Sequence, residues 1–125
     1  DALTDNFIKG RTGNETLKIA IKESKKLGLR PQIYTHPLGL YGHSAGTTFG
    51  MWDAQNGIPG SGEHPLYENT AYAIELNAKV YIDKWQKDIR IMLEEAGFFG
   101  PSGFRYVNGR QTNLILIGQK SKYLE

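Results

Sequence analysis

The residues best suited to chemistry lie in the stretch 33–53, which holds His36 and His43 but no lysine or arginine. Two glutamates follow later in the chain, Glu75 within an apolar, β-branched run and Glu94 within the next such run. One imidazole with hard carboxylate oxygens suits Mn, Fe, Co or Zn rather than a metal that prefers thiolates. One hypothesis is therefore a metal site with His43, Glu75 and Glu94 as ligands.

Each histidine also has a structural interpretation. His43 lies between Gly42 and Ser44, where glycine lets the backbone approach another group closely, but a lone histidine is more often a hydrogen-bonded structural residue. His36 could donate a hydrogen bond to a metal ligand or act as a proton shuttle beside a metal-bound water. Alternatively, it is a loop histidine whose ring nitrogens are hydrogen-bonded for structural reasons. His64 lies in a loop and reads as a surface residue or as a substrate contact.

The alternation of residues 70–82 separates Glu75 from the apolar side of its strand. Two neighbouring carboxylates with little solvent repel each other, and each resists ionisation unless a cation lies between them. If the runs containing Glu75 and Glu94 form a hairpin, both carboxylates project toward one face and a divalent ion relieves the repulsion. Alternatively, Glu94 or Glu95 is simply exposed at a strand end, since the two point to opposite faces.

The elements expected to position these residues are a helical start followed by strands. Residues 3–9 predict a short helix, and residues 11–29 a clearer one, because Thr12 and Glu15 form a capping-box pattern and Gly28 ends it. A glycine- and proline-rich loop is expected at 54–69. Strands are expected at 32–35, 70–82, 89–99, where helix propensity competes, and 112–118, the last of them central. This order indicates an α+β fold with helices on an antiparallel sheet.

Composition excludes several classes of function. A formal charge of +2 in 125 residues demands neither nucleic acid nor an anionic membrane as a partner, and the absence of cysteine excludes thiolate catalysis and disulfides. No apolar run is long enough to span a membrane. The glycines fit no dinucleotide or phosphate loop, and no GxSxG motif is present. The compartment stays open between cytoplasm and periplasm.

Three motifs in order resemble the C-terminal half of the pita-bread metallopeptidases, the family of methionine aminopeptidase, Xaa-Pro aminopeptidase, prolidase and creatinase. GHSAG resembles the family's His-x-x-Gly and implies His43 as a metal ligand. AYAIELNAKV resembles the strand that carries a ligand glutamate, here Glu75. IRIMLEEAGFF is similar to the family's R-[IL]-E-[ED] strand with two extra residues, which implies Glu94 as the last ligand and Glu95 as the reserve.

The resemblance also concerns two further histidines of the family. One follows the ligand histidine by seven residues and falls at Gly50 here, and one precedes it by four residues and falls at Gly39. After a small insertion, His36 could serve in place of the second of these. The resemblance thus implies His36 and Glu94 as catalytic residues, with His36 steadying the developing oxyanion.

The resemblance implies a peptidase that acts on N-terminal Xaa-Pro bonds through a hydroxide held between two divalent ions, such as manganese. Two aspartate ligands belong to the N-terminal half of that fold. Residues 1–125 are therefore expected to be a half-domain of a longer parent, inactive alone, with peptide as substrate and a homodimer as one possible assembly. The alternatives are a catalytically inactive, peptide-binding or scaffolding member of the fold and a creatinase-like enzyme acting on a small C–N substrate.

Overall fold

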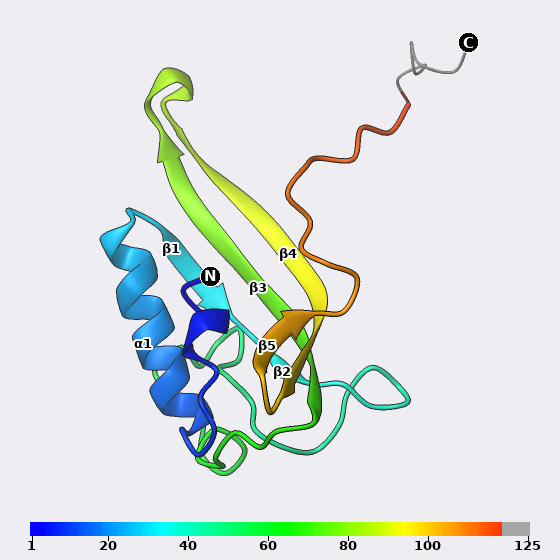
Figure 1. The fold of residues 1–125 in the computed structure, drawn as a ribbon. Coiled ribbons are helices and arrows are strands. Elements are labelled where there is room, and N and C mark those ends of the chain that lie inside the picture. The colour runs from blue at the N-terminus through cyan, green and yellow to red at the C-terminus, as the bar shows by residue number, and fades with distance from the viewer. Residues whose placement is uncertain (119–125) are drawn as a thin grey trace, which may run out of the picture.

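The computed structural model describes residues 1–118, in which one α-helix packs against a five-stranded antiparallel sheet (Figure 1). The strands lie in the order β1-β3-β4-β5, and the short β2 pairs with β3 beyond the end of β1. The expected α+β class is confirmed. The elements are η1 (Thr4–Asn6), α1 (Gly13–Lys26), β1 (Arg30–Ile33), β2 (His36–Pro37), β3 (Thr70–Ile82), η2 (Asp83–Trp85), β4 (Lys87–Gly100) and β5 (Gly103–Tyr106).

The helix α1 begins where the sequence predicts. The Thr12 side chain accepts from the Glu15 backbone N–H, and the Glu15 carboxylate accepts from the Thr12 N–H at 2.9 Å, so the capping box is complete. Leu17 and Ala20 turn one side of the helix into the core. Gly28, at φ +73°, follows the helix in the left-handed conformation that glycine adopts without strain.

The hairpin of β3 and β4 is the largest element of the sheet. Its strands pair continuously from Thr70 with Phe99 to Ile82 with Lys87, and the 3-10 turn η2 joins them. The expectation that 89–99 forms a strand rather than a helix is confirmed. The helix side of β3 carries the buried Tyr72 and Ile74, and the opposite side carries Glu75.

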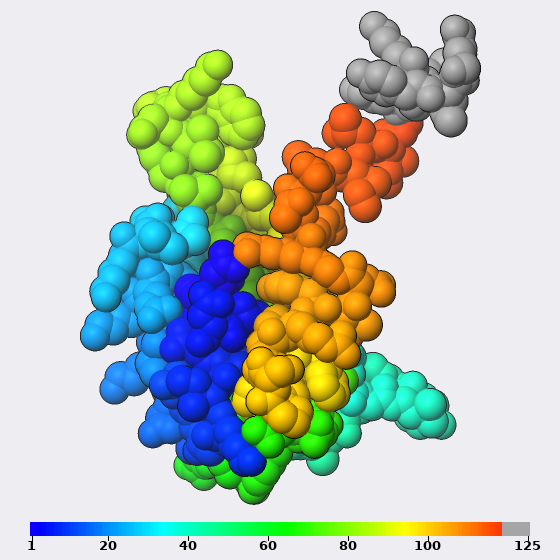
Figure 2. Space-filling model, in the orientation of Figure 1, coloured from blue at the N-terminus to red at the C-terminus, as the bar shows by residue number. Residues whose placement is uncertain are grey.

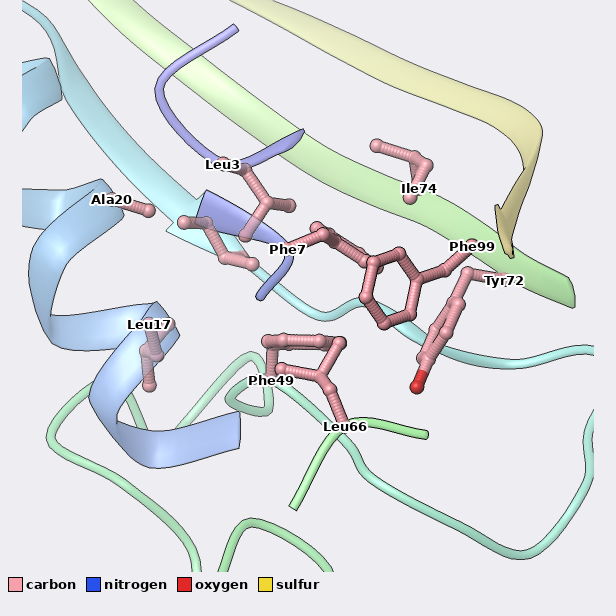
Figure 3. Packing of buried hydrophobic residues seen from close by; sticks show 10 residues of the cluster. Leu3, Phe7, Leu17, Ala20, Phe49, Leu66, Tyr72, Ile74 and Phe99 are labelled. Atoms are coloured by element: carbon pink, nitrogen blue, oxygen red, sulfur yellow. The ribbon is translucent and has the colours of Figure 1, made fainter. Parts of the chain in front are cut away.

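An aromatic cluster holds η1 against the sheet (Figure 3). The Phe7 ring lies 5.0 Å from the ring of Phe49 and 5.1 Å from that of Tyr72, in a tilted and an edge-on contact. Phe99 and Phe104 complete the cluster, with ring centroids 5.8 and 5.0 Å from that of Phe7. Because α1, η1 and this cluster all lie on one side, no helix of residues 1–118 covers the other side of the sheet.

Three expectations from the sequence need correction. Residues 112–118 form no strand: no backbone pairing to the sheet follows the contact of Gln111 with the Glu95 side chain, the aliphatic residues Leu114–Ile117 are 68–93% exposed, and this end of the described chain projects from the body (Figure 2). The helix expected at 3–9 is only the 3-10 turn Thr4–Asn6, whose flanking Leu3 and Phe7 are buried while Ile8 is exposed. The strand expected at 32–35 begins earlier, at Arg30.

Among residues 1–118, no helix combines the length and the apolar character that crossing a bilayer requires.

The Tyr72 hydroxyl gives stability a dependence on alkaline pH. Burial raises its pKa to about 12, against the lowering effect of a hydrogen bond with Thr47. The raised pKa means that the unfolded chain loses this proton first, so stability present below pH 10 falls as pH rises toward 12. Between about pH 9 and pH 11 we expect a loss of about 1 kcal/mol from this group.

Urea unfolding at both pH values measures this loss. Tyr72→Phe should remove that part of the pH dependence, whereas the matched change Tyr81→Phe, at a half-exposed position on the same strand, should keep it. Equal slopes in Tyr72→Phe and the unchanged protein would contradict the assignment.

Candidate functional site

His36 is the histidine that the sheet fixes in place. It opens β2, pairs with Ala73 of β3, and is only 4% exposed. Its Nδ1 lies 3.1 Å from the carbonyl oxygen of Pro37. Because a carbonyl can only accept, Nδ1 must carry the proton of this hydrogen bond.

The other ring nitrogen of His36 faces a carboxylate. Its Nε2 lies 3.5 Å from Oε2 of Glu75, which is longer than a well-formed N–H···O bond. With Nδ1 protonated, Nε2 is either a second N–H of an imidazolium or a bare lone pair beside a carboxylate. The second arrangement is favourable only when a cation or a water proton lies between the two atoms.

His43 is exposed and lies in the loop that follows β2. Its ring stacks on that of His36 at a centroid distance of 3.9 Å and an interplanar angle of 9°. The loop is tied back where the Ser44 N–H donates to the Pro37 carbonyl at 3.0 Å. His43 is therefore the solvent-facing member of a histidine pair whose buried member contacts Glu75.

Two aromatic residues that the sequence did not single out flank this pair. Tyr34 lies on the same side of the sheet, 5.2 Å from the His36 ring and 6.3 Å from the His43 ring, and Trp52 packs edge-on against Tyr34 at 5.9 Å. The Trp52 carbonyl accepts from Gln32 at 3.1 Å. The alternation of Gln32, Tyr34 and His36 could have predicted a shared face, but only if their strand had been placed correctly.

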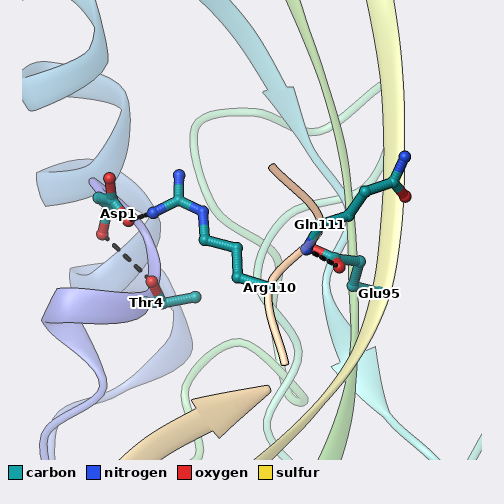
Figure 4. A network of polar contacts seen from close by, with 5 residues as sticks. All are labelled: Asp1, Thr4, Glu95, Arg110 and Gln111. Carbon is teal, nitrogen blue, oxygen red and sulfur yellow. Dashed lines mark hydrogen bonds and ion pairs between the residues drawn. The ribbon is translucent and has the colours of Figure 1, made fainter. Parts of the chain in front are cut away.

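Glu75 and Glu94 are direct cross-strand partners in the β3–β4 hairpin. Partners in an antiparallel pair point to the same face of the sheet, so both carboxylates lie on the side without a helix, with His36. Glu95 points the other way: it pairs with Ile74 of the core face, and its carboxylate accepts from the Gln111 N–H at 2.9 Å (Figure 4).

Glycine is required at Gly39 and Gly50, the two positions at which the metallopeptidases that the sequence resembles carry further histidines. Gly50 is buried at φ +67°, and a Cβ there would lie 2.5 Å from the Ile33 carbonyl oxygen. A Cβ on Gly39 would lie 2.5 Å from the carbonyl oxygen of His43. Any side chain at either position would force the backbone apart, so neither could carry a histidine in this fold.

The motif His-x-x-Gly occurs twice, a feature that the sequence interpretation did not use. It fits His36 with Gly39 as well as His43 with Gly46, and His43 follows His36 by seven residues. The structure places the first of these histidines, not the second, in contact with Glu75.

The donors present do not make a complete metal site. Within residues 1–118, no three histidine, aspartate or glutamate side chains gather closely enough to hold an ion. The predicted trio of His43, Glu75 and Glu94 therefore does not converge. What does lie together is a partial donor set of the right chemistry: an imidazole nitrogen facing one carboxylate, with a second carboxylate in register beside it.

His64 lies apart from this group. It is an exposed residue of the loop 54–69, and its backbone carbonyl accepts from the Gly13 N–H at the start of α1. This backbone hydrogen bond ties the loop to the start of the helix.

Comparison with known proteins identifies no relative. No family model matches the chain, and neither the curated proteins nor the solved structures contain a significant match.

The hydrogen bond to Pro37 predicts the tautomer of His36. We expect Nδ1 of His36 to carry a proton in the folded protein, because its partner, the Pro37 carbonyl oxygen, can only accept a hydrogen bond. Long-range ¹H–¹⁵N correlation spectra report the protonation of each ring nitrogen, and the exposed His43 provides an internal comparison. A His36 ring protonated at Nε2 alone would contradict the geometry.

Proposed function

We propose that this chain is the C-terminal half of a metal-dependent peptidase of the pita-bread type, with its site on the side of the sheet that carries no helix. The observation that carries the proposal is the placement of three donors on one face of the sheet: Nε2 of His36 faces the Glu75 carboxylate at 3.5 Å, and Glu94 is the cross-strand partner of Glu75. These are one nitrogen donor and two oxygen donors on three neighbouring strands. The resemblance to the family names the same residue types in the same order along the chain.

The geometry favours exchanging the roles of the two histidines. His36 is buried, held by the Pro37 carbonyl and aimed at Glu75, as a ligand histidine oriented by a hydrogen bond at its other nitrogen should be. His43 then takes the family position seven residues further on. Its exposed ring is free to donate a hydrogen bond to a substrate oxygen, so the family pattern no longer requires a histidine at Gly50.

The two extra residues in the second glutamate motif are compatible with this site. Side chains of a strand alternate between faces, so an insertion of two residues keeps Glu94 on the same face as Arg90, whereas one residue would have moved it to the core side. The direct pairing of Glu94 with Glu75 supports Glu94, rather than Glu95, as the second carboxylate.

Three donors are fewer than a dinuclear site needs, and they are not gathered in this chain. We propose that the N-terminal half of the fold supplies two aspartates and draws the donors together around two divalent ions, manganese, cobalt, zinc or iron. Such ions, when bound, act as Lewis acids and lower the pKa of a bound water. The chain's own carboxylates would accept the proton of that water, and His43 would orient the peptide carbonyl oxygen.

The adjacent pair Glu94 and Glu95 provides a test with a matched control. Glu94→Gln removes a carboxylate from the proposed site, and Glu95→Gln makes the same change on the opposite face of the same strand. In the full protein that contains this chain, we expect Glu94→Gln to lower Xaa-Pro hydrolysis at least about a hundredfold, and Glu95→Gln to leave it within about twofold. Loss of activity in Glu95→Gln alone would contradict the assignment.

The two histidines should differ in what their removal affects. His36→Ala should reduce the manganese bound per protein, measured by elemental analysis, because it removes a ligand. His43→Ala should leave the metal content unchanged and lower kcat. If His43→Ala alone removed the metal, the original assignment of His43 as the ligand would be restored.

The rival function is peptide binding without catalysis, and the incomplete donor set in residues 1–118 favours it. A full protein that binds proline-containing peptides but retains no metal after purification in manganese would support this rival. Hydrolysis by the isolated 125-residue chain would contradict the requirement for a second half.

A further inference from the structure

Among residues 1–118, most of one edge of the long hairpin has no strand beside it. β5 pairs with β4 only from Gly97 to Gly100, and in the described chain no strand pairs with the same edge of β4 from Lys87 to Glu95. Long open edges with apolar side chains are sites for the addition of another strand. Along this edge Ile91, Met92 and Leu93 are 50–62% exposed.

The direction of the backbone groups along this edge follows from one hydrogen bond. Backbone groups of successive residues in a strand point to alternate neighbours. The Ala96 carbonyl accepts from the Val107 N–H on the β5 side, so alternate residues from Ala96 back along β4 also point outward. Within the described part of the chain, the N–H and C=O groups of Arg90, Met92 and Glu94 thus point to this edge without a backbone partner.

The same chain carries a segment suited to this edge. Residues Leu114–Ile117 are four consecutive aliphatic residues outside any helix or strand, and all are at least 68% exposed. In an added strand, alternation would send two of these side chains to each face. One pair would extend the apolar face of Ile91 and Leu93, and the other would lie against Met92.

This segment does not occupy its own chain's edge. The Arg110 guanidinium pairs with Asp1, and the Gln111 N–H donates to Glu95, so the segment is anchored where it leaves the body (Figure 4). A groove of about 380 Å³ separates residues 111–114 from residues 91–95 of β4. Beyond Leu114 the chain runs away from the sheet (Figure 1).

We propose that two copies of this chain associate by exchanging this segment, each adding its residues 112–117 as a strand to the open edge of β4 in the other. A second copy fits better than an unrelated partner because it carries both halves of the contact. A two-fold axis then forms the contact twice, and the closed dimer leaves neither edge open.

Two variants separate the halves of the contact. Ile115→Asp with Ile117→Asp places charges on the segment, and Met92→Pro removes an N–H that points away from β3, which leaves the hairpin's own pairing intact. Each should raise the dissociation constant of the dimer at least about tenfold in sedimentation equilibrium. Leu40→Asp, which places a charge at an equally exposed aliphatic residue of another loop, should not change it.

Mixing the two variants distinguishes strand exchange from other forms of dimer. The segment variant retains a good edge and the edge variant retains a good segment, so the mixture should form a heterodimer with one intact contact. Circular dichroism confirms that both variants are folded. A monomeric unchanged protein, or a mixture that associates no better than either variant alone, would overturn the proposal.

Discussion

The register of the β3–β4 hairpin is the constraint on which the rest of the structure depends. A shift of one residue would move Tyr72 and Ile74 out of the core and turn Glu75 into it. The aromatic cluster around Phe7 fixes which face is buried, and the hydrogen-bonded ladder transmits that choice along the strands. The carboxylate rung of Glu75 and Glu94 is therefore a consequence of core packing on the opposite face.

The local patterns of the sequence predicted the elements that carry strong signals. Thr12 and Glu15 mark the start of α1, and the alternation of 70–82 predicts both the strand and the direction of Glu75. The prediction of a strand at 112–118 was wrong, because the aliphatic residues there favour a strand but do not specify which strand would pair with it. Propensity alone cannot tell whether Leu114–Ile117 pairs within its own chain, with another chain, or with nothing.

The candidate site could be predicted from the sequence only in part. Residue types and order pointed to Glu75 and Glu94, and their pairing follows from the hairpin. The choice between His36 and His43 could not be made, because both fit His-x-x-Gly and only tertiary contacts show which ring reaches Glu75. The stacking of Tyr34 and Trp52 around the histidines likewise depends on contacts between distant segments.

The most direct test of the proposed metal site is anomalous diffraction from crystals of the proposed full-length protein grown with manganese. The account predicts a peak on the helix-free side of the sheet, within coordinating distance of Nε2 of His36 and of the carboxylates of Glu75 and Glu94. A manganese peak bound by other residues, or no peak beside these three side chains in crystals of active enzyme, would contradict it.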